Sequence, residues 1–287
     1  MAKNYQLIHR ISSCKSQSTN VYKAVSLASR EYYTIKITDF DDLTDPDITL
    51  NEISRIRHIR HSNILPLLSC FVQDCQIWSI YPHIQYGSCR DILNVIRDYY
   101  LNNVENEPNS SVVWDRADEQ IRLCFNEQSL QPIIKSVLLA LDYLHSKHII
   151  HRCICPENVF ITHSGHVYLG GMGFSVSLMD NGFLNKRLHD YPARIENYVN
   201  YLSPEILQQN LIGYNAKSDI YSLGVTVCEL ANGTHPFTGC QKVQMLFEKL
   251  VGYDIGLWDR SILTPESKNT FVSGIVCLCT NSQLVLN

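Results

Sequence analysis

The chain has 287 residues, 45% of them hydrophobic and 18% charged, which is enough apolar material for one or two folded domains and excludes a disordered or fibrous protein. With 24 Lys and Arg against 28 Asp and Glu, the formal net charge of -4 excludes a broad basic surface that would bind nucleic acid or an acidic membrane. No apolar run approaches the roughly 20 residues that cross a bilayer, and no signal peptide follows Met1, so we expect a cytoplasmic or nuclear protein.

The first 86 residues contain no glycine, whereas all 13 glycines lie from Gly87 onward. This step in composition places a domain boundary near Gly87, with residues 1–86 before it and 87–287 after it. Before the boundary, short β-branched and aromatic runs alternate with polar turns, which predicts an antiparallel sheet. Its expected strands are Tyr5–Ile11, Val21–Val25, Tyr32–Ile37, Leu65–Val72 and Ile77–Tyr81.

Three segments have the apolar spacing of helices. Asp45-Pro46 is a helix-start signal, and it precedes an amphipathic helix that we expect over Asp47–Arg60, packed on the sheet. A second helix is expected to begin at Ser129, and Asp219–Ala231 is apolar almost all round, which predicts a buried central helix. The apolar positions are Leu50, Ile53, Ile56 and Ile59 in the first helix, and Ile133, Ile134, Val137, Leu138, Leu141 and Leu144 in the second.

Between these two later helices, Val159–Ile161 and Val167–Leu169 flank a turn and predict a hairpin. In the polar segment 101–127, apolar residues do not recur with the period of a helix or a strand, and we interpret the segment as a surface insertion. The order of the elements predicts an α+β fold in which a small β-rich part precedes a larger helical part. The 11 cysteines are scattered without a Cys-x-x-Cys pair, so reduced thiols are expected and no metal site is predicted.

Several separated segments match the protein-kinase signature set in the right order, and the joint match is more specific than any one segment. Lys36, in Thr34-Ile35-Lys36, stands where kinases carry the strand lysine that holds the α- and β-phosphates, and Glu52 stands where its carboxylate partner belongs. The further matches are His151-Arg152 and Asn158 in the catalytic loop, Ser203-Pro204-Glu205 at the end of the activation segment, and Asp219. Most of the chain therefore resembles the two-lobed protein-kinase fold, and in that family the counterpart of Asp219 holds the backbone of the catalytic loop.

Phosphoryl transfer also needs a carboxylate that accepts the substrate's proton and a carboxylate that anchors magnesium, and this sequence supplies neither. Cys153 stands at the position of the base, and Cys155 stands at that of the lysine that steadies the transferred phosphate. Gly171 replaces the metal-binding aspartate, and a hard magnesium ion needs oxygen ligands that a glycine side chain does not offer. The sequence therefore predicts a pseudokinase with no catalytic residue and no metal site, rather than an enzyme.

The expected nucleotide pocket is altered as well. The loop before Val21 contains no glycine that would let backbone N–H groups approach phosphates. The candidate nucleotide-binding residues are Val21, Ile84 and Phe160 around an adenine ring, and Lys36, Glu52 and Asn158 toward the phosphates. Because the same apolar residues would suit a packed interface between the lobes, ATP binding without magnesium and no nucleotide binding both stay open.

Six stretches narrow the family further: Leu202–Leu211, Gly213–Ser222, Cys228–Gly233, Gln244–Leu250, His189–Pro192 and Tyr86–Ser88. Together they are similar to the sterile-20-related adaptor (STRAD) pseudokinases. The resemblance implies a catalytically inactive adaptor that binds a liver kinase B-type serine/threonine kinase and activates it allosterically. It also implies a second partner, a helical-repeat scaffold like mouse protein twenty-five.

The chain departs from that family at three places. Lys36 stands where the vertebrate adaptors typically carry arginine, and the insertion 101–127 has no counterpart. After Gly252 there is no Asn-Pro…Arg-Pro segment and no Trp-Glu-Phe tail that would dock the scaffold. We therefore expect incomplete C-terminal helices, an atypical and truncated end at 253–287, and a buried Glu205 without its usual arginine partner.

Two other functions stay open at this point. Lys36, Glu52 and Asn158 are compatible with a divergent ATP-binding serine/threonine kinase of residual activity. The missing C-terminal segment is compatible with a non-functional truncated product. The adaptor-like block over residues 202–233 favours the adaptor over the kinase.

Overall fold

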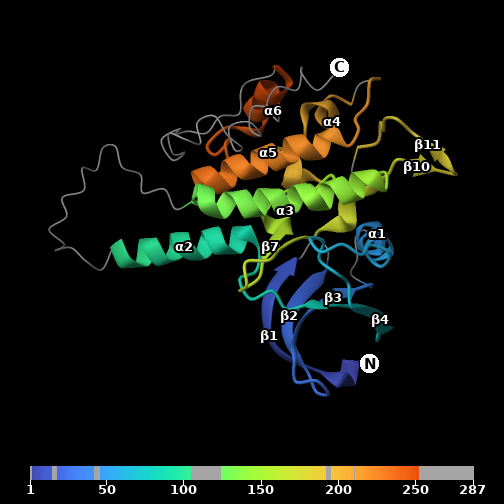
Figure 1. Ribbon diagram of the computed structural model, residues 1–287, viewed down its shortest axis with the longest axis vertical. Helices are drawn as coiled ribbons and strands as arrows, with labels where there is room; N and C mark the ends of the chain where they lie inside the picture. The colour runs from blue at the N-terminus through green and yellow to red at the C-terminus, as the bar shows by residue number, and fades with distance from the viewer. Residues whose placement is uncertain are drawn as a thin grey trace.

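The computed structural model describes residues 2–14, 18–41, 46–104, 124–191, 195–209 and 211–251. Its N-terminal part is a five-stranded antiparallel sheet in the order β1-β2-β3-β5-β4, as the sequence predicts. The strands are β1 (Tyr5–Cys14), β2 (Thr19–Ser26), β3 (Tyr32–Asp39), β4 (Ser69–Gln73) and β5 (Gln76–Pro82). Figure 1 shows this sheet at one end of the molecule, with helix α1 (Pro46–Ile56) beside it.

All five predicted strands are present, but β4 starts later than expected. It begins at Ser69 rather than Leu65, because the residues before it belong to the larger core. The Leu65 N–H donates to Leu169 O over 2.9 Å, and both Leu65 and Leu67 are buried. The apolar run from Leu65 therefore predicts correctly that these residues are buried, but it does not predict which segment their backbone hydrogen-bonds.

Helix α1 begins at Pro46, as predicted, and ends at Ile56, before the expected Arg60. Ile56 and Ile59 are buried, but Leu50 is 46% exposed, so its assignment to the packed face is wrong. The reason is geometric, since a recurrence every three residues falls short of a full helical turn by about 60° at each step. Leu50 therefore faces away from the side on which the later isoleucines pack.

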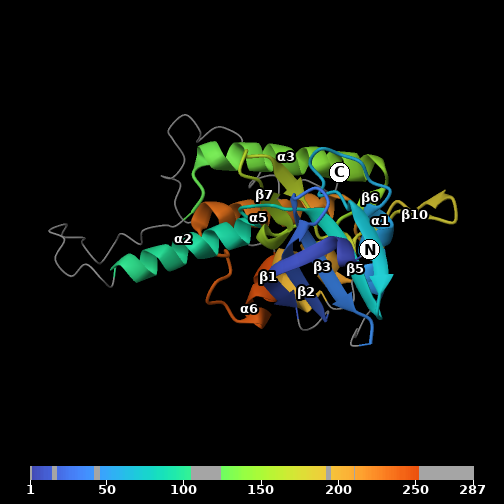
Figure 2. The same cartoon turned by 90° about the horizontal axis from the view of Figure 1, so that it is seen from below.

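The C-terminal part is mostly helical, and Figures 1 and 2 show α3 and α5 running side by side through it while α2 points away from the body. Its helices are α2 (Cys89–Val104), α3 (Glu127–Ser146), α4 (Pro204–Gln208), α5 (Lys217–Asn232) and α6 (Lys242–Val251). Its short strands pair as β6–β9, β7–β8 and β10–β11: β6 (Ile149–Ile150), β7 (Val159–Ile161), β8 (Val167–Leu169), β9 (Val176–Ser177), β10 (Met179–Asp180) and β11 (Phe183–Leu184). The 3-10 helices within the described ranges are η1 (Ala2–Asn4), η3 (Pro156–Asn158), η4 (Met172–Phe174) and η5 (Glu196–Tyr201).

The predicted hairpin and the predicted central helix are both confirmed. The hairpin is β7–β8, with the expected bounds. In α5, every residue from Ser218 to Asn232 is buried except Ile220, which is partly exposed. A helix apolar all round therefore occupies the centre of the helical part.

Two helix boundaries differ from those expected. The second predicted helix, α3, begins at Glu127 instead of Ser129, because Asn126 is its N-cap and accepts a hydrogen bond from the Ser129 N–H over 2.9 Å. Helix α2 was not expected at all, and its last residues overlap the segment that we interpreted as an insertion. Residues 105–123 of that segment lie outside the described residues, as does the expected atypical end at 253–287.

Two hydrophobic clusters hold the described residues together. A small one lies in the sheet around Ile35 and Ile80, and a large one runs through the helical part and takes in the last turn of α1 at Ile56. Tyr81 of β5 also belongs to the large cluster, so both the sheet itself and α1 pack against the helical part. None of the helices in the described ranges is both long and apolar enough to cross a membrane.

Candidate functional site

Strand β3 and helix α1 bring Lys36 and Glu52 together. Lys36 Nζ donates a hydrogen bond to Glu52 Oε2 over 2.6 Å. The side chains are 19% and 13% exposed, so solvent and salt screen this ion pair less than they screen a surface pair. The pairing expected from the sequence is present, and it ties α1 to the sheet. Val21 lies directly opposite Lys36 in the β2–β3 register, which places this candidate adenine contact beside the pair.

The buried carboxylate of Asp219 holds the catalytic loop, as the family resemblance implies. Asp219 lies on the first turn of α5 and is fully buried. It accepts hydrogen bonds from the backbone N–H groups of His151 over 2.9 Å and of Arg152 over 2.8 Å. His145 Nε2 lies 2.8 Å from the same carboxylate. The loop is therefore fixed from the core side rather than by anything that binds from solvent.

His151 is a structural residue of this loop. Its Nδ1 accepts from the Cys153 N–H over 3.2 Å, so its Nε2 carries the proton and donates to Gly170 O over 2.8 Å. Burial lowers the pKa of His151, although Asp219 opposes that shift. A neutral imidazole with both nitrogens occupied cannot replace the missing proton acceptor.

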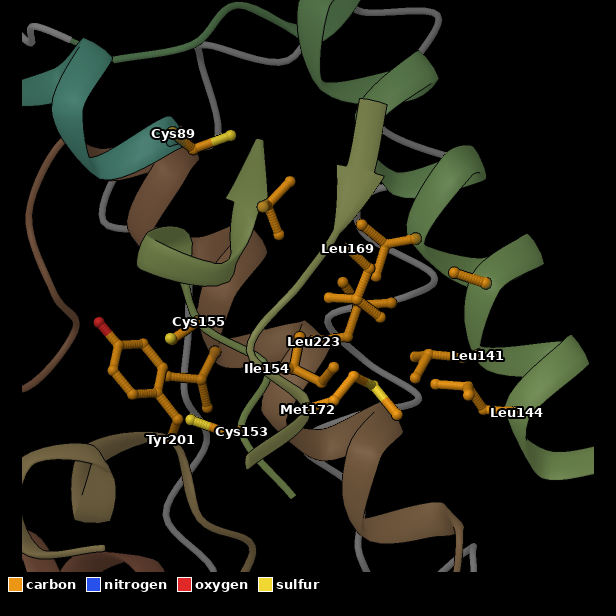
Figure 3. Packing of buried hydrophobic residues seen from close by; sticks show 14 of the residues in the cluster. Cys89, Leu141, Leu144, Cys153, Ile154, Cys155, Leu169, Met172, Tyr201 and Leu223 are labelled. Carbon is orange, nitrogen blue, oxygen red and sulfur yellow. The ribbon is translucent and has the colours of Figure 1, made fainter. Parts of the chain in front are cut away.

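The two cysteines of the catalytic loop lie in the hydrophobic core. Figure 3 shows Cys153 and Cys155 beside Ile154 and Tyr201 within the cluster, and the two thiols are 2% and 0% exposed. Burial raises the pKa of Cys155 well above its usual value, so its thiol stays protonated. The protonated thiol of Cys155 therefore offers no charge to a nucleotide phosphate.

The backbone at Gly171, which the kinase resemblance aligns with the metal-binding aspartate, leaves no room for a side chain. That backbone is left-handed at φ 76°, and an added Cβ would overlap the carboxamide of Asn158. Asn158 Nδ2 instead donates to Cys153 O over 2.8 Å, with Cys153 Sγ 3.3 Å away. Within the described residues, no group of three or more His, Cys, Asp or Glu could hold a metal ion. The carboxamide of Asn158 therefore fills the space that a side chain at position 171 would need.

The other candidate adenine contacts lie on the side of the large cluster. Ile84 and Phe160 are partly buried and pack against it. Phe160, on β7, lies under Gly170, where an added Cβ would be 2.9 Å from its ring. The loop before Val21 lies outside the described residues at positions 15–17. These placements suit both an adenine site and a packed interface, so the alternatives left open by the sequence remain open.

An ion pair that the sequence did not predict fastens the activation segment to the catalytic loop. The guanidinium of Arg152, only 9% exposed, donates to Asp190 Oδ2 over 2.5 Å and to Tyr214 Oη over 2.9 Å. Tyr214 Oη in turn donates to Asp190 Oδ1 over 2.8 Å. The stretch His189–Pro192 supported the family resemblance, but nothing in its spacing indicated which cation it would meet.

A second unpredicted cluster surrounds Arg90 on the first turn of α2. Arg90 Nε donates to Glu157 Oε1 over 2.9 Å, and its Nη2 donates to Glu229 and, over 2.9 Å, to Tyr201 Oη. Tyr201 Oη also donates to Glu229 Oε2 over 2.6 Å. Burial raises the pKa of Glu229, and the neighbouring Arg90 opposes that shift. One guanidinium thus joins α2, the catalytic loop, the end of the activation segment and α5.

The end of the activation segment is held by a lysine that the sequence reasoning missed. Lys249, on α6, is 2% exposed and donates to the carbonyls of Val199, Asn200 and Leu202 at 3.3, 2.6 and 2.8 Å. Burial lowers its pKa to about 7. Glu205, on α4 three residues after Leu202, is partly exposed, so the expectation of a buried carboxylate there is wrong.

The family model of the protein kinase domain matches residues 15–281. STE20-related kinase adapter protein alpha of Mus musculus is 33% identical over 238 residues, which are 82% of this chain and 50% of the mouse protein. STE20-related kinase adapter protein strd-1 of Caenorhabditis elegans is 34% identical over 223 residues, 78% of this chain and 50% of the nematode protein. The beta protein of Homo sapiens is 31% identical over 268 residues, 93% of this chain and 58% of the human protein. The chain spans about half the length of the curated relatives that it matches.

Proposed function

The chain belongs to the protein kinase family, and we propose that it acts within that family as a catalytically inactive adaptor that activates a liver kinase B-type serine/threonine kinase. Relatives named STE20-related kinase adapter proteins, at about a third identity over most of this chain, support the adaptor class. The choice of partner rests on the resemblance to STRAD pseudokinases.

The observation that carries the inactive part of the proposal is the closure at Gly171. A metal-bridged nucleotide needs an oxygen ligand at this position, and the carboxamide of Asn158 fills the space. At the position of the base, Cys153 is buried and accepts from Asn158. Loss of a positioned base alone typically costs a hundredfold to about ten-thousandfold in rate. Loss of the base and of the metal ligand together supports a protein without phosphoryl-transfer activity.

The observation that favours the alternative, a divergent kinase, is the intact pair of Lys36 and Glu52. In an adaptor the same pair has a structural purpose, because it holds α1 against the sheet. The pair is also compatible with weak ATP binding without magnesium, in which Lys36 would contact a phosphate. The pair therefore does not by itself require catalysis.

An adaptor needs a fixed shape, not chemistry, because it shifts its partner's equilibrium only through a difference in affinity for the two states of that partner. The proposed contact surface consists of α1 and the activation segment over residues 171–205. Asp219, Arg152 and Lys249 fix the loop and the segment from the core side. A helical-repeat scaffold like mouse protein twenty-five is the second proposed partner.

The proposal is tested by complex formation. The tagged chain is co-expressed with a liver kinase B-type kinase, with and without the scaffold, and the purified material is analysed by size-exclusion chromatography. We expect a stoichiometric complex with the kinase that Glu52→Ala weakens and that Asp98→Ala, an exposed substitution on α2, leaves intact. A version extended by a complete C-terminal segment is tested beside it. Complex formation by the extended version alone would identify a truncated product instead.

A further inference from the structure

Asn51 joins helix α1 to the start of the activation segment. Its Nδ2 donates to Gly173 O over 2.7 Å and to Ser175 O over 2.8 Å, so both amide hydrogens are used. Its Oδ1 accepts from Arg55 Nε over 3.3 Å. Ile48, one turn earlier on α1, packs so close to Gly173 that an added Cβ would lie 2.7 Å from Ile48 Cγ2. The helix and the segment therefore meet through a fully bonded carboxamide and a contact that only glycine permits.

The neighbouring carbonyls of this turn are bound as well. Phe174 O accepts from Arg152 Nε over 2.5 Å. Met172 O accepts from the N–H of Ser175 over 3.1 Å and from Ser175 Oγ over 2.7 Å. All four consecutive carbonyls from Met172 to Ser175 thus have protein donors. Since a buried carbonyl without a donor costs free energy, a turn bonded in this way is stable without a ligand.

Two adjacent residues of α1 connect the helix to different parts of the fold. Glu52 binds Lys36 on the sheet, and Asn51 binds the activation segment of the helical part. The α1 helix consequently bridges the two parts of the fold through protein contacts alone. In an arrangement that depended on a nucleotide, part of this bridge would be made by the phosphates and their metal, and the closed position of Gly171 provides no ligand for that metal.

We propose that Asn51 is a positioning residue that holds α1 and the activation segment in one fixed arrangement without nucleotide or metal. The inference rests on the proposed function, because the same two elements form the surface proposed for the partner kinase. Its consequence is regulatory. The partner surface is permanently formed, and ATP does not switch it on.

The test is hydrogen exchange of the purified full chain, followed in peptides that cover residues 171–178. Asn51→Ala removes the two donors, and we expect exchange there to become at least fivefold faster. Asn51→Asp is expected to do the same, because it keeps the size of the side chain and the acceptor for Arg55 but loses both donors. Asn94→Ala is the matched control, since Asn94 accepts a hydrogen bond from Arg97 on the exposed side of α2. Exchange in α5 reports whether a variant has loosened the whole fold.

A second measurement uses the wild-type chain alone, with and without ATP. Exchange over residues 171–178 is expected to change by less than fivefold when ATP is added, with magnesium or with EDTA. A fivefold or greater slowing by ATP overturns the proposal, and so does exchange in Asn51→Asp that stays within fivefold of the wild type. These measurements contain no partner kinase, so a failure to activate the partner would overturn the proposed function and leave this result standing.

Discussion

The carboxamide of Asn158 lies where any side chain at Gly171 would have to be. The kinase resemblance aligns these two positions with the pair that holds magnesium, whereas here Asn158 fills the space beside Gly171. Asn158 is bonded to the Cys153 carbonyl instead of facing a metal. An aspartate introduced at position 171 would therefore meet the carboxamide of Asn158.

Restoring the missing carboxylates should not restore catalysis. Cys153→Asp combined with Gly171→Asp is expected to show no transfer from labelled ATP above a Lys36→Met control, because the new side chain meets Asn158 and Cys155 remains. Gly171→Asp should also destabilise the fold by about 1–2 kcal/mol from its left-handed backbone alone, and by more because of the overlap with Asn158. Urea unfolding measures this difference.

Gly182→Asp is the matched control for that strain. Gly182 also has a positive φ of 85°, but nothing lies within 4 Å of the place where its Cβ would be. The cost at position 171 should exceed that at position 182 by about 1 kcal/mol or more. Equal costs, or measurable phosphoryl transfer by the restored double variant, would refute the closed site.

Binding of ATP, if it occurs through Lys36, should be weak and independent of magnesium. In a thermal-shift titration, we expect a small stabilisation that persists in EDTA and disappears in Lys36→Met. The reason is that Lys36 supplies a phosphate contact while no described residue at Gly171 supplies a metal ligand. A stabilisation that vanishes on chelation contradicts this prediction, and no stabilisation in either buffer would leave the pocket as packing only.

Asp190→Ala should destabilise the fold through the cation that it leaves behind. Arg152 is 9% exposed, so its charge would lose its carboxylate partner in a largely buried place. Breaking a buried pair costs about 3–5 kcal/mol, but Asp190 is itself 51% exposed, so we expect a reduced cost of about 1–3 kcal/mol in urea unfolding. Asp98→Ala breaks the exposed Arg97–Asp98 pair and should cost about 0.5 kcal/mol or less. An equal loss of unfolding free energy in the two variants would show that the ion pair between Arg152 and Asp190 does not stabilise the fold more than a surface pair does.

Lys249 should make stability depend on pH. Its pKa is lowered to about 7 in the fold from an ordinary 10.5, so between these values the unfolded chain holds a proton that the folded chain has released. The free energy of unfolding therefore increases as pH rises, by roughly 2 kcal/mol from pH 7 to pH 9, which means that the fold becomes more stable. The difference in free energy of unfolding between the wild type and Lys249→Met should rise by this amount. Lys242→Met, on the exposed side of the same helix, should give a flat difference, and a flat difference for both variants would contradict the burial of a lysine ammonium.

How much the sequence predicted depends on whether a residue acts inside one element or between elements. The strands, the central helix and the partnership of Lys36 with Glu52 follow from period and motif spacing, which are local or family-wide signals. Leu50 was misplaced because a three-residue recurrence drifts around a helix. The sequence could suggest which groups catalysis lacks, but not what fills their places.

The residues that bind the activation segment to the rest of the fold could not be predicted from period or motif spacing. Asn51, Asp190 and Lys249 each bind atoms that lie far away in the sequence, and two of the three bind backbone carbonyls, which every residue has. A polar side chain that donates to a distant carbonyl leaves no pattern in a single sequence. Only the tertiary arrangement identifies these residues.

We propose that this chain activates another kinase without catalysing phosphoryl transfer itself. The most direct measurement is the activity of a co-purified liver kinase B-type kinase on its peptide substrate, alone and with the chain, with a catalytically dead version of that partner to show whose activity is counted. We predict that the wild-type chain raises the partner's activity, that Glu52→Ala raises it less, and that the dead partner yields no phosphate transfer. Unchanged partner activity with the wild-type chain in a confirmed complex, or phosphate transfer in the presence of the dead partner, would contradict the account.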